Sequence, residues 1–181
     1  TLTASLTRPL SNSEYENIGR PKEWGVLPIR PMGATIRMTK DRRILIRNTA
    51  ELSNPNNFPS AHLETRKKIH EMGINKRFPS LPNNIIESTW SGVVCRSRNG
   101  SQIFEKINDN IFVAGCYNGS GIGTGTFFGE QIALMASNQD SDKIGIIEDR
   151  VKPTKLPIDI LVNIGVYTRL IYERLRARTE I

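Results

Sequence analysis

Ile111-Phe-Val-Ala-Gly-Cys-Tyr-Asn-Gly-Ser-Gly-Ile-Gly-Thr-Gly125 joins a short apolar run to a cluster of alternating glycines. The run 111–114 is typical of a fully buried strand, and residues 124–137 predict a helix with one apolar side. Glycine lets a ligand approach the backbone closely, and the first amides of a helix have no partner within it. The segment therefore predicts a place where a polar or anionic group meets a helix start.

The glycine spacing narrows the kinds of ligand that the turn could take. Gly119, Gly121, Gly123 and Gly125 are not followed by the Lys-Ser/Thr of a phosphate-binding Walker loop. They also lack the Gly-x-Gly-x-x-Gly spacing of a Rossmann turn. A tight strand-to-helix turn without a ligand accounts for the same glycines, so the turn alone leaves both interpretations open.

The residues before this segment alternate between apolar and polar side chains, which is typical of half-buried strands. We expect a hairpin of strands 34–39 and 44–48, and we expect residues 11–31, rich in Gly and Pro, to form a long loop. A surface helix at 59–77 is expected to be half buried through Leu63, Ile69, Met72 and Ile74 and to leave His62 and His70 in water. A further strand is expected at 1–10.

The rest of the chain predicts more strands and a final helix. Asn99-Gly100 is the strongest hairpin signal and is expected to join strands 92–97 and 102–105. Another strand is expected at 85–90, a polar linker at 138–156 and a basic amphipathic helix at 158–178. Together these elements predict an α+β fold, with a mixed, mainly antiparallel sheet covered by helices.

Composition sets limits on function. The 181 residues can bury an ordinary core, and the net charge of +7 permits contact with nucleic acid or an anionic membrane without requiring it. Two cysteines are too few for a disulfide framework. With only two histidines beside them, no metal site is predicted. Cys95 and Cys116 are interpreted as small buried thiols. Without a run of about 20 apolar residues, a cytoplasmic protein is expected.

Several motifs, taken in order, resemble the C-terminal flavin-contacting segment of the FAD-dependent D-amino acid oxidase (DAO) superfamily. The nearest group in this resemblance is that of gamma-glutamylputrescine oxidoreductase and glycine oxidase. The motifs that carry it are Thr3-Ala-Ser-Leu-Thr-Arg-Pro-Leu10, Ile36-Arg-Met-Thr-Lys-Asp-Arg-Arg-Ile-Leu45, Trp90-Ser-Gly92, the turn at Asn99-Gly100, Asp109-Asn-Ile-Phe-Val-Ala114, Tyr117-Asn-Gly-Ser-Gly121 and Gly129.

The resemblance implies an enzyme that oxidises a C–N bond of an amine or amino acid by hydride transfer to FAD. It also implies which residues contact the cofactor. Backbone amides of Gly121, Ile122 and Gly123 match those that face the pyrimidine edge of the flavin, with Gly119 and Ser120 in the same turn. Trp90 and Gly92 match the strand that passes close to the flavin ring. Such a protein divides into substrate-domain residues 1–84, strands returning to the FAD domain at 85–137, a linker at 138–157 and the C-terminal helix at 158–181.

The sequence also departs from that family. No Gly-x-Gly-x-x-Gly lies in residues 1–84, so the chain resembles the C-terminal half of a longer protein. We therefore expect an N-terminal FAD-binding portion of the same protein as partner, and an inactive fragment without it. The arginine and lysine that clamp substrate carboxylates in relatives are matched by Val94 and Gly123. Arg37, Arg96 and Arg98 are the cations expected near the pocket, and Arg37, placed by alternation opposite Ile36 and Met38, is the favoured candidate for substrate contact.

The charge of the chain supports an alternative function. Arginines cluster on the last helix, at 158–181, beside apolar residues at helical spacing. This helix could make the chain a basic binding module for an anionic membrane, nucleic acid or a protein partner. Nucleic acid is the least expected of the three, because no recognition motif or stacking aromatic accompanies the basic clusters. A peripheral membrane contact stays open.

Overall fold

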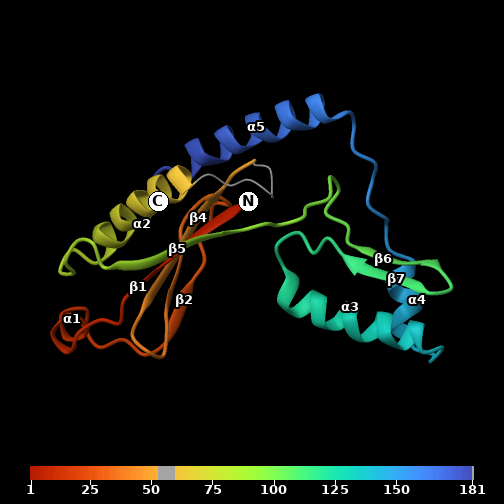
Figure 1. Ribbon diagram of the computed structural model, residues 1–181, viewed down its shortest axis with the longest axis horizontal. Helices are drawn as coiled ribbons and strands as arrows, with labels where there is room; N and C mark the ends of the chain where they lie inside the picture. The colour runs from red at the N-terminus through yellow and green to blue at the C-terminus, as the bar shows by residue number, and fades with distance from the viewer. Residues whose placement is uncertain (53–59, 181) are drawn as a thin grey trace. The chain divides into compact units, whose positions relative to one another are not determined.

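The computed structural model describes residues 1–52 and 60–180, arranged as two compact units (Figure 1). Unit 1 consists of Thr1–Val93 and Ile160–Ile181, and unit 2 consists of Val94–Asp159. Each unit is described by itself. The expected division into substrate-domain and cofactor-domain residues stays a prediction, because compactness does not assign a function to either unit.

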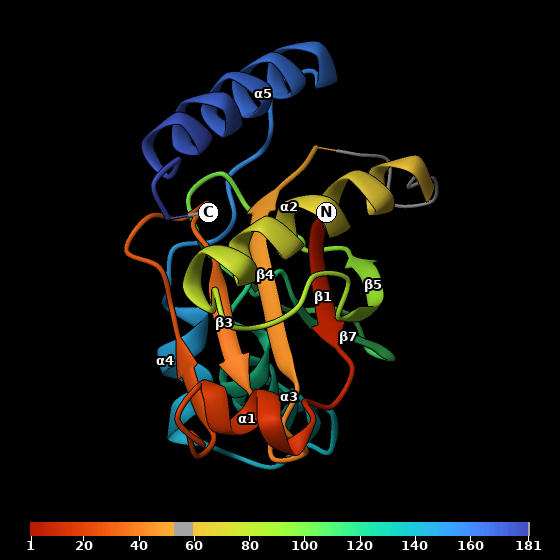
Figure 2. The ribbon, with the colours of Figure 1, turned by 90° about the vertical axis from the view of Figure 1, so that its left-hand side faces the viewer.

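Unit 1 is built on a five-stranded antiparallel sheet. Its strands follow the order β2 (Trp24–Val26), β3 (Thr35–Met38), β4 (Ile44–Ala50), β1 (Leu2–Thr7) and β5 (Ile86–Gly92). Helix α2 (Ser60–Arg77) crosses one face of the strands (Figure 2). The α+β class and the predicted β3–β4 hairpin are confirmed, and the predicted helix matches α2 except for Pro59, which lies outside the described residues.

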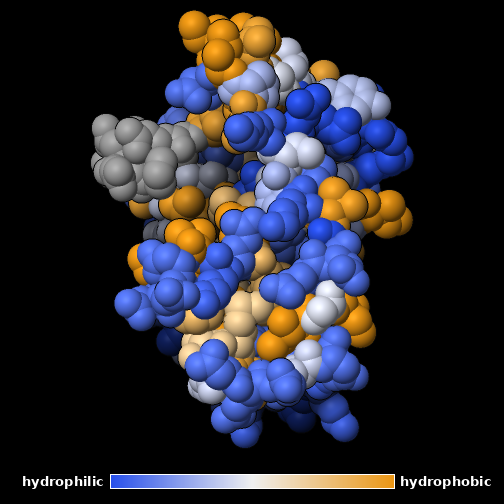
Figure 3. Space-filling model, turned by 90° about the vertical axis from the view of Figure 1, so that its right-hand side faces the viewer, coloured by the Kyte–Doolittle hydropathy of each residue, from blue (hydrophilic) through white to orange (hydrophobic). Residues whose placement is uncertain are grey.

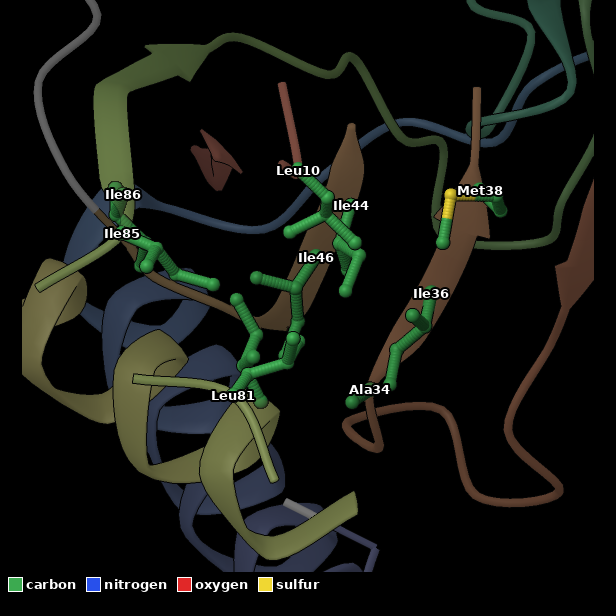
Figure 4. Close-up of a cluster of buried hydrophobic side chains, with 10 residues drawn as sticks. Leu10, Ala34, Ile36, Met38, Ile44, Ile46, Leu81, Ile85 and Ile86 are labelled. Carbon is green, nitrogen blue, oxygen red and sulfur yellow. The ribbon is translucent and has the colours of Figure 1, made fainter. Parts of the chain in front are cut away.

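The core of unit 1 lies between this sheet face and α2 (Figure 4). Alternation directs Ile44 and Ile46 of β4 and Met38 of β3 inward, where each is at most 1% exposed. Burying an aliphatic side chain of this size contributes roughly 1.5–3 kcal/mol. Ile74 meets them from α2, whereas Met72, expected on the same side, is exposed. The residues that complete this cluster are Leu10, Ala34, Ile36, Leu81, Ile85 and Ile86.

A buried polar network attaches α2 to the middle of the sheet. His70 Nδ1 lies 2.7 Å from Ser5 Oγ, and His70 Nε2 lies 3.0 Å from Asn48 Oδ1. Ser5 Oγ also lies 2.8 Å from Thr89 Oγ1. The expectation of a water-exposed His70 is wrong: the side chain is fully buried, and burial, then the charge of Arg66, lowers its pKa to about 4. A neutral imidazole donates to Asn48 and accepts from Ser5.

The predicted loop 11–31 contains two elements, so that expectation is also wrong. Helix α1 (Asn12–Asn17) begins with a capping box, in which Ser11 accepts from the Glu14 amide and Glu14 accepts from the Ser11 amide. A paired hydrogen bond from Arg8 lowers the pKa of Glu14 to about 2. Strand β2 then adds to the sheet edge through pairs such as Gly25–Arg37.

Unit 2 packs a hairpin against two helices. Strands β6 (Ile103–Asn108) and β7 (Ile111–Gly115) pair, and helices α3 (Gly121–Ala136) and α4 (Asp142–Glu148) follow. Its core is small: Phe104, Phe128 and Ile147 are the buried members. The ring of Phe128 stands edge-on to Phe104, with 5.4 Å between centroids.

Three local predictions fail in unit 2. Residues 93–102 form no strand, and the hairpin turn is at Asp109 and Asn110 instead of Asn99-Gly100. The side chain of Asn99 is used elsewhere, donating to the Lys152 carbonyl at 2.9 Å. The predicted linker holds α4, whose start is capped by Ser141.

Helix α5 (Asp159–Arg176) matches the predicted C-terminal helix, and its last turns are attached to the sheet of unit 1. Arg174 donates to the Thr49 hydroxyl at 2.9 Å and to the Ala50 carbonyl at 2.7 Å. Beyond the helix, the Glu180 carbonyl accepts from the Ala34 amide at 2.9 Å and from Arg77 at 2.8 Å. Hydrophobic side chains gather on the surface of its first turns (Figure 3).

Candidate functional site

The glycine turn between β7 and α3 has an unusual backbone. Cys116 and Asn118 have φ of +56°, and Gly119 has φ of +97°. Left-handed conformations are favourable for glycine and tolerable for asparagine, so Asn118-Gly119 suits this turn. The Ser120 amide closes it by donating to the Tyr117 carbonyl at 2.9 Å. The turn predicted from sequence is confirmed as a strand-to-helix connection, with α3 beginning at Gly121, three residues earlier than expected.

The three glycines at the start of α3 face different surroundings. A Cβ on Gly125 would lie 3.2 Å from the ring of Tyr117, and one on Gly121 would lie 3.7 Å from the same ring. These two positions, four apart on a helix, form a groove that receives the Tyr117 ring. A Cβ on Gly123 would meet nothing within 4 Å. Packing therefore explains Gly125, and in part Gly121, but it gives no reason for a glycine at position 123.

The first amides of α3 carry no side-chain cap. Ser120 occupies the N-cap position, but its hydroxyl makes no capping hydrogen bond, in contrast to Ser11 before α1. Ile122 is 92% exposed, and residues 119–124 line a shallow surface hollow. Unpaired amides and the helix dipole together make this helix start favourable for negative charge. Arg96 adds a nearby cation, with its Nη2 atom 3.8 Å from a Cβ placed on Gly119.

Unit 1 holds the other residues that the sequence singled out. Arg37 of β3 is exposed on the sheet face opposite α2, as alternation predicts, because Ile36 and Met38 point into the core. Trp90 of β5, 42% exposed, lies on the same face: it pairs with Ala4, whose neighbours in β1 point to the core. Gly92 ends this strand in open space.

Sequence reasoning missed a second cation on this face. Arg47 of β4 pairs with Ala4 on one side and Thr35 on the other, so Ala4 separates it from Trp90 across three strands. Its Nη2 atom donates to the Thr35 hydroxyl at 2.9 Å, which orients the guanidinium. The sequence pattern that could have revealed Arg47 is the alternation of 44–50, in which it falls between two buried residues. Trp90 and Arg47 on either side of the small Ala4, with Arg37 one strand beyond Arg47, form a platform for a planar or anionic group.

The two cysteines are not the buried thiols expected. Cys95 is exposed and Cys116 is half-buried, and their sulfur atoms lie 3.3 Å apart. Among residues 1–52 and 60–180, no three His, Cys, Asp or Glu side chains are grouped as metal ligands would be. The glycine turn belongs to unit 2, whereas Arg37, Arg47, Trp90 and Gly92 belong to unit 1. That these two groups serve one site stays a prediction.

Comparison with known proteins gives one match. The family model DAO, described as FAD dependent oxidoreductase, matches residues 3–135, which is more than half of the chain. No curated protein and no solved structure matches the chain. The match covers both the sheet of unit 1 and the glycine turn with α3.

Proposed function

The chain belongs to the DAO family of FAD-dependent oxidoreductases, and from this we propose that it takes part in oxidising a C–N bond of an amine or amino acid. FAD is the cofactor expected for this family. The single observation that supports a cofactor role for this chain is the uncapped start of α3, with Gly123 free of packing. Within the family, we propose a member near the gamma-glutamylputrescine oxidoreductase and glycine oxidase group.

The residues present at the glycine turn suit the polar edge of a flavin ring. When bound, FAD supplies the hydride acceptor for the reaction. The amides of residues 121–123 would donate to the carbonyl oxygens and nitrogen of that edge, and the α3 dipole would stabilise negative charge there. A side chain at position 123 would occupy the same open space. We propose that an N-terminal portion of the same protein holds the pyrophosphate and adenosine.

The sheet face opposite α2 is our candidate for substrate contact. The backbone of Arg37 pairs with β2 and β4, but its guanidinium makes no hydrogen bond or ion pair with residues 1–52 or 60–180, so it can bind a carboxylate bidentately. Arg47, held by Thr35, would position a second anionic group. Trp90 offers an apolar surface on the same face, with Ala4 of β1 between it and Arg47. This arrangement favours an amino acid, or an amine that carries an acidic group elsewhere in the molecule.

The cofactor proposal is tested by the visible spectrum of the protein produced from its complete gene. Gly123→Leu should reduce FAD affinity at least tenfold by filling the open space at the amides. Gly129→Leu is the matched control, since Gly129 is in the same helix and a Cβ there also meets nothing within 4 Å. A protein that stays colourless after reconstitution with FAD, or equal loss in both variants, would overturn the proposal.

The substrate proposal is tested separately by steady-state kinetics, with bleaching of the flavin spectrum used first to screen amines against amino acids. Arg37→Gln should raise KM for a carboxylate-bearing substrate about tenfold or more, because a charged hydrogen bond is lost, and should leave KM for a plain amine unchanged. Arg42→Gln is the control: Arg42 is in the β3–β4 turn and pairs with Asn12. Equal KM changes for both substrate types would count against Arg37.

Helix α5 supports a second candidate function, peripheral contact with an anionic membrane. Ile160, Leu161, Ile164 and Tyr167 of its first turns are each more than half exposed, and arginines follow in the last turns. No helix in the described ranges has the length and apolar character to cross a bilayer. Sedimentation with vesicles of phosphatidylserine, compared with phosphatidylcholine, tests this contact. Ile164→Glu should abolish co-sedimentation, and equal binding to both vesicles would argue against it.

A further inference from the structure

The two cysteines of this chain lie side by side although 20 residues separate them in the sequence. Their sulfur atoms are 3.3 Å apart, with Cys95 exposed and Cys116 half-buried. Both belong to unit 2, so the contact is internal to one compact unit. Because the chain contains only two cysteines, any intramolecular disulfide must join this pair.

A set of hydrogen bonds keeps the two cysteine-bearing segments together. The Asn118 side chain accepts from the Ser97 amide at 2.9 Å and donates to the Gly100 carbonyl at 2.9 Å. It also donates to the Cys116 carbonyl at 2.9 Å. One amide side chain thus binds residues 97–100 to the turn, two residues beyond each cysteine. The closeness of the sulfur atoms therefore results from a fixed backbone arrangement, not from a chance side-chain rotamer.

The surroundings give the two thiols different roles. Burial, then the hydrogen bond with Cys95, raises the pKa of Cys116 above its ordinary value. Cys116 therefore keeps its proton at neutral pH until its partner reacts. Cys95 is exposed and meets reagents from solution first. Moving the sulfurs from 3.3 Å to the bonding distance of about 2.05 Å requires only a small side-chain adjustment.

We propose that Cys95 and Cys116 are a redox modification site that forms a reversible disulfide with low-molecular-weight disulfides as the oxidant. The Cys95 thiolate attacks one sulfur of the small disulfide RSSR, forming a mixed disulfide and releasing RS⁻. Cys116 then loses its proton and attacks the Cys95 sulfur, which breaks the mixed disulfide and releases a second RS⁻. In sum, two protein thiols are oxidised and RSSR is reduced to two RSH.

The disulfide would act on the glycine turn. Cys116 lies between β7 and the left-handed residues Asn118 and Gly119, so the bond would tie the turn to residues 95–101. Fixing this turn restricts the backbone that leads into the first amides of α3. Disulfide formation itself does not rest on the proposed cofactor function, and its test reads thiols instead of flavin.

The experiment titrates the whole chain with buffers of reduced and oxidised glutathione, traps free thiols with a maleimide and measures intact mass. The expected product is a monomer that has lost two hydrogens and accepts no maleimide. The equilibrium constant for forming this disulfide with oxidised glutathione should be at least tenfold larger in buffer than in denaturing urea, because the fold holds the sulfurs together. Intermolecular dimers, persistent free thiols, or equal constants in buffer and urea would overturn the proposal.

Single variants test the order of the two steps. Cys116→Ser should accumulate the mixed disulfide with glutathione on Cys95, whereas Cys95→Ser should react at least tenfold more slowly at Cys116. Hydrogen exchange compares the oxidised and reduced chains directly. Amides of residues 117–120 should exchange more slowly after oxidation, with those of β1 in unit 1 as the internal reference. Unchanged exchange in the turn would show that the disulfide does not restrain it.

Discussion

The two units differ in the polar groups that they enclose and in those that they leave at the surface. Unit 1 encloses a polar network: Ser5, Asn48 and His70 are at most 1% exposed and bonded to one another beneath α2. Unit 2 also buries Gln131, which is bonded to Ser141, but it leaves the first amides of α3 at its surface without a side-chain cap. Buried polar groups must find partners within the protein, so those of unit 1 specify its structure. Unpaired amides at a surface remain available to a ligand, which is why the proposed cofactor contact rests on unit 2.

The most severe disruption is expected from Phe128→Ala in the small core of unit 2. Phe128 is 2% exposed and contacts Phe104 and Tyr117, so its removal should cost about 3–5 kcal/mol. Both tryptophans, Trp24 and Trp90, are in unit 1. Tryptophan fluorescence during urea unfolding therefore reports unit 1 alone, whereas far-UV circular dichroism reports both units.

If the units unfold separately, this variant shifts part of the dichroism transition and leaves the fluorescence transition in place. Phe127→Ala is the control, since Phe127 is its neighbour on α3 and 38% exposed. If Phe128→Ala lowers the free energy of unfolding by less than about 1 kcal/mol, unit 2 has another core. An equal shift of both transitions would show that the two units unfold as one.

A second prediction concerns the buried imidazole of unit 1. The pKa of His70 is about 4 in the folded chain and about 6.5 when unfolded, so between these values the unfolded chain binds one more proton. The free energy of unfolding should therefore fall as pH drops from 6.5 toward 4, by on the order of 3 kcal/mol in total. Urea unfolding followed by tryptophan fluorescence across this range measures it.

Variants at both histidines separate His70 from other groups that titrate in this range. His70→Gln should be less stable at pH 7 and should lose most of this pH dependence. His62→Gln is the control, because His62 is an exposed residue of the same helix, 3.4 Å from Glu51. The dependence of the free energy of unfolding on pH should be unchanged in His62→Gln. If His70→Gln keeps the full dependence, the carboxylates would be its source.

The smallest expected change in stability distinguishes the start of α1 from the start of α3. Ser11→Ala removes the capping hydrogen bond of α1 and should cost about 1 kcal/mol. Ser120→Ala at the N-cap of α3 removes no such bond and should change stability by less than about 0.5 kcal/mol. Thermal unfolding of the two variants side by side measures the difference. Equal losses would mean that Ser120 does cap α3, which would remove the argument for a free helix start.

Local patterns predicted the regular elements but not their tertiary partners. The β3–β4 hairpin, α2, α3 and α5 follow from periodicity, and the glycine turn follows from its composition. His70 could not be placed, because its burial depends on Ser5 and Asn48, which are distant in the sequence. Helix α1 was missed although Ser11-Asn-Ser-Glu14 has the spacing of a capping box, since the surrounding Gly and Pro dominated the prediction.

The candidate site was predicted in part. Periodicity correctly placed Arg37 on the exposed sheet face, and the glycine turn indeed begins a helix. Arg47 escaped notice because its role depends on the register of β4 with β3 and β1. The contact between Cys95 and Cys116 escaped for a related reason, as it depends on the hydrogen bonds of the Asn118 side chain. Such contacts between distant segments leave no local sequence pattern.

The chain leaves unit 1 at Val93 and returns to it at Ile160, and this order has a consequence for synthesis on the ribosome. All residues of unit 2 emerge before Arg174 and Glu180, which complete the hydrogen bonds to Ala50 and Ala34. Nascent domains fold as their residues become available. Unit 2 can thus finish folding while unit 1 still lacks its closing segment, so a stalled or shortened translation product would present a sheet with its last partner missing.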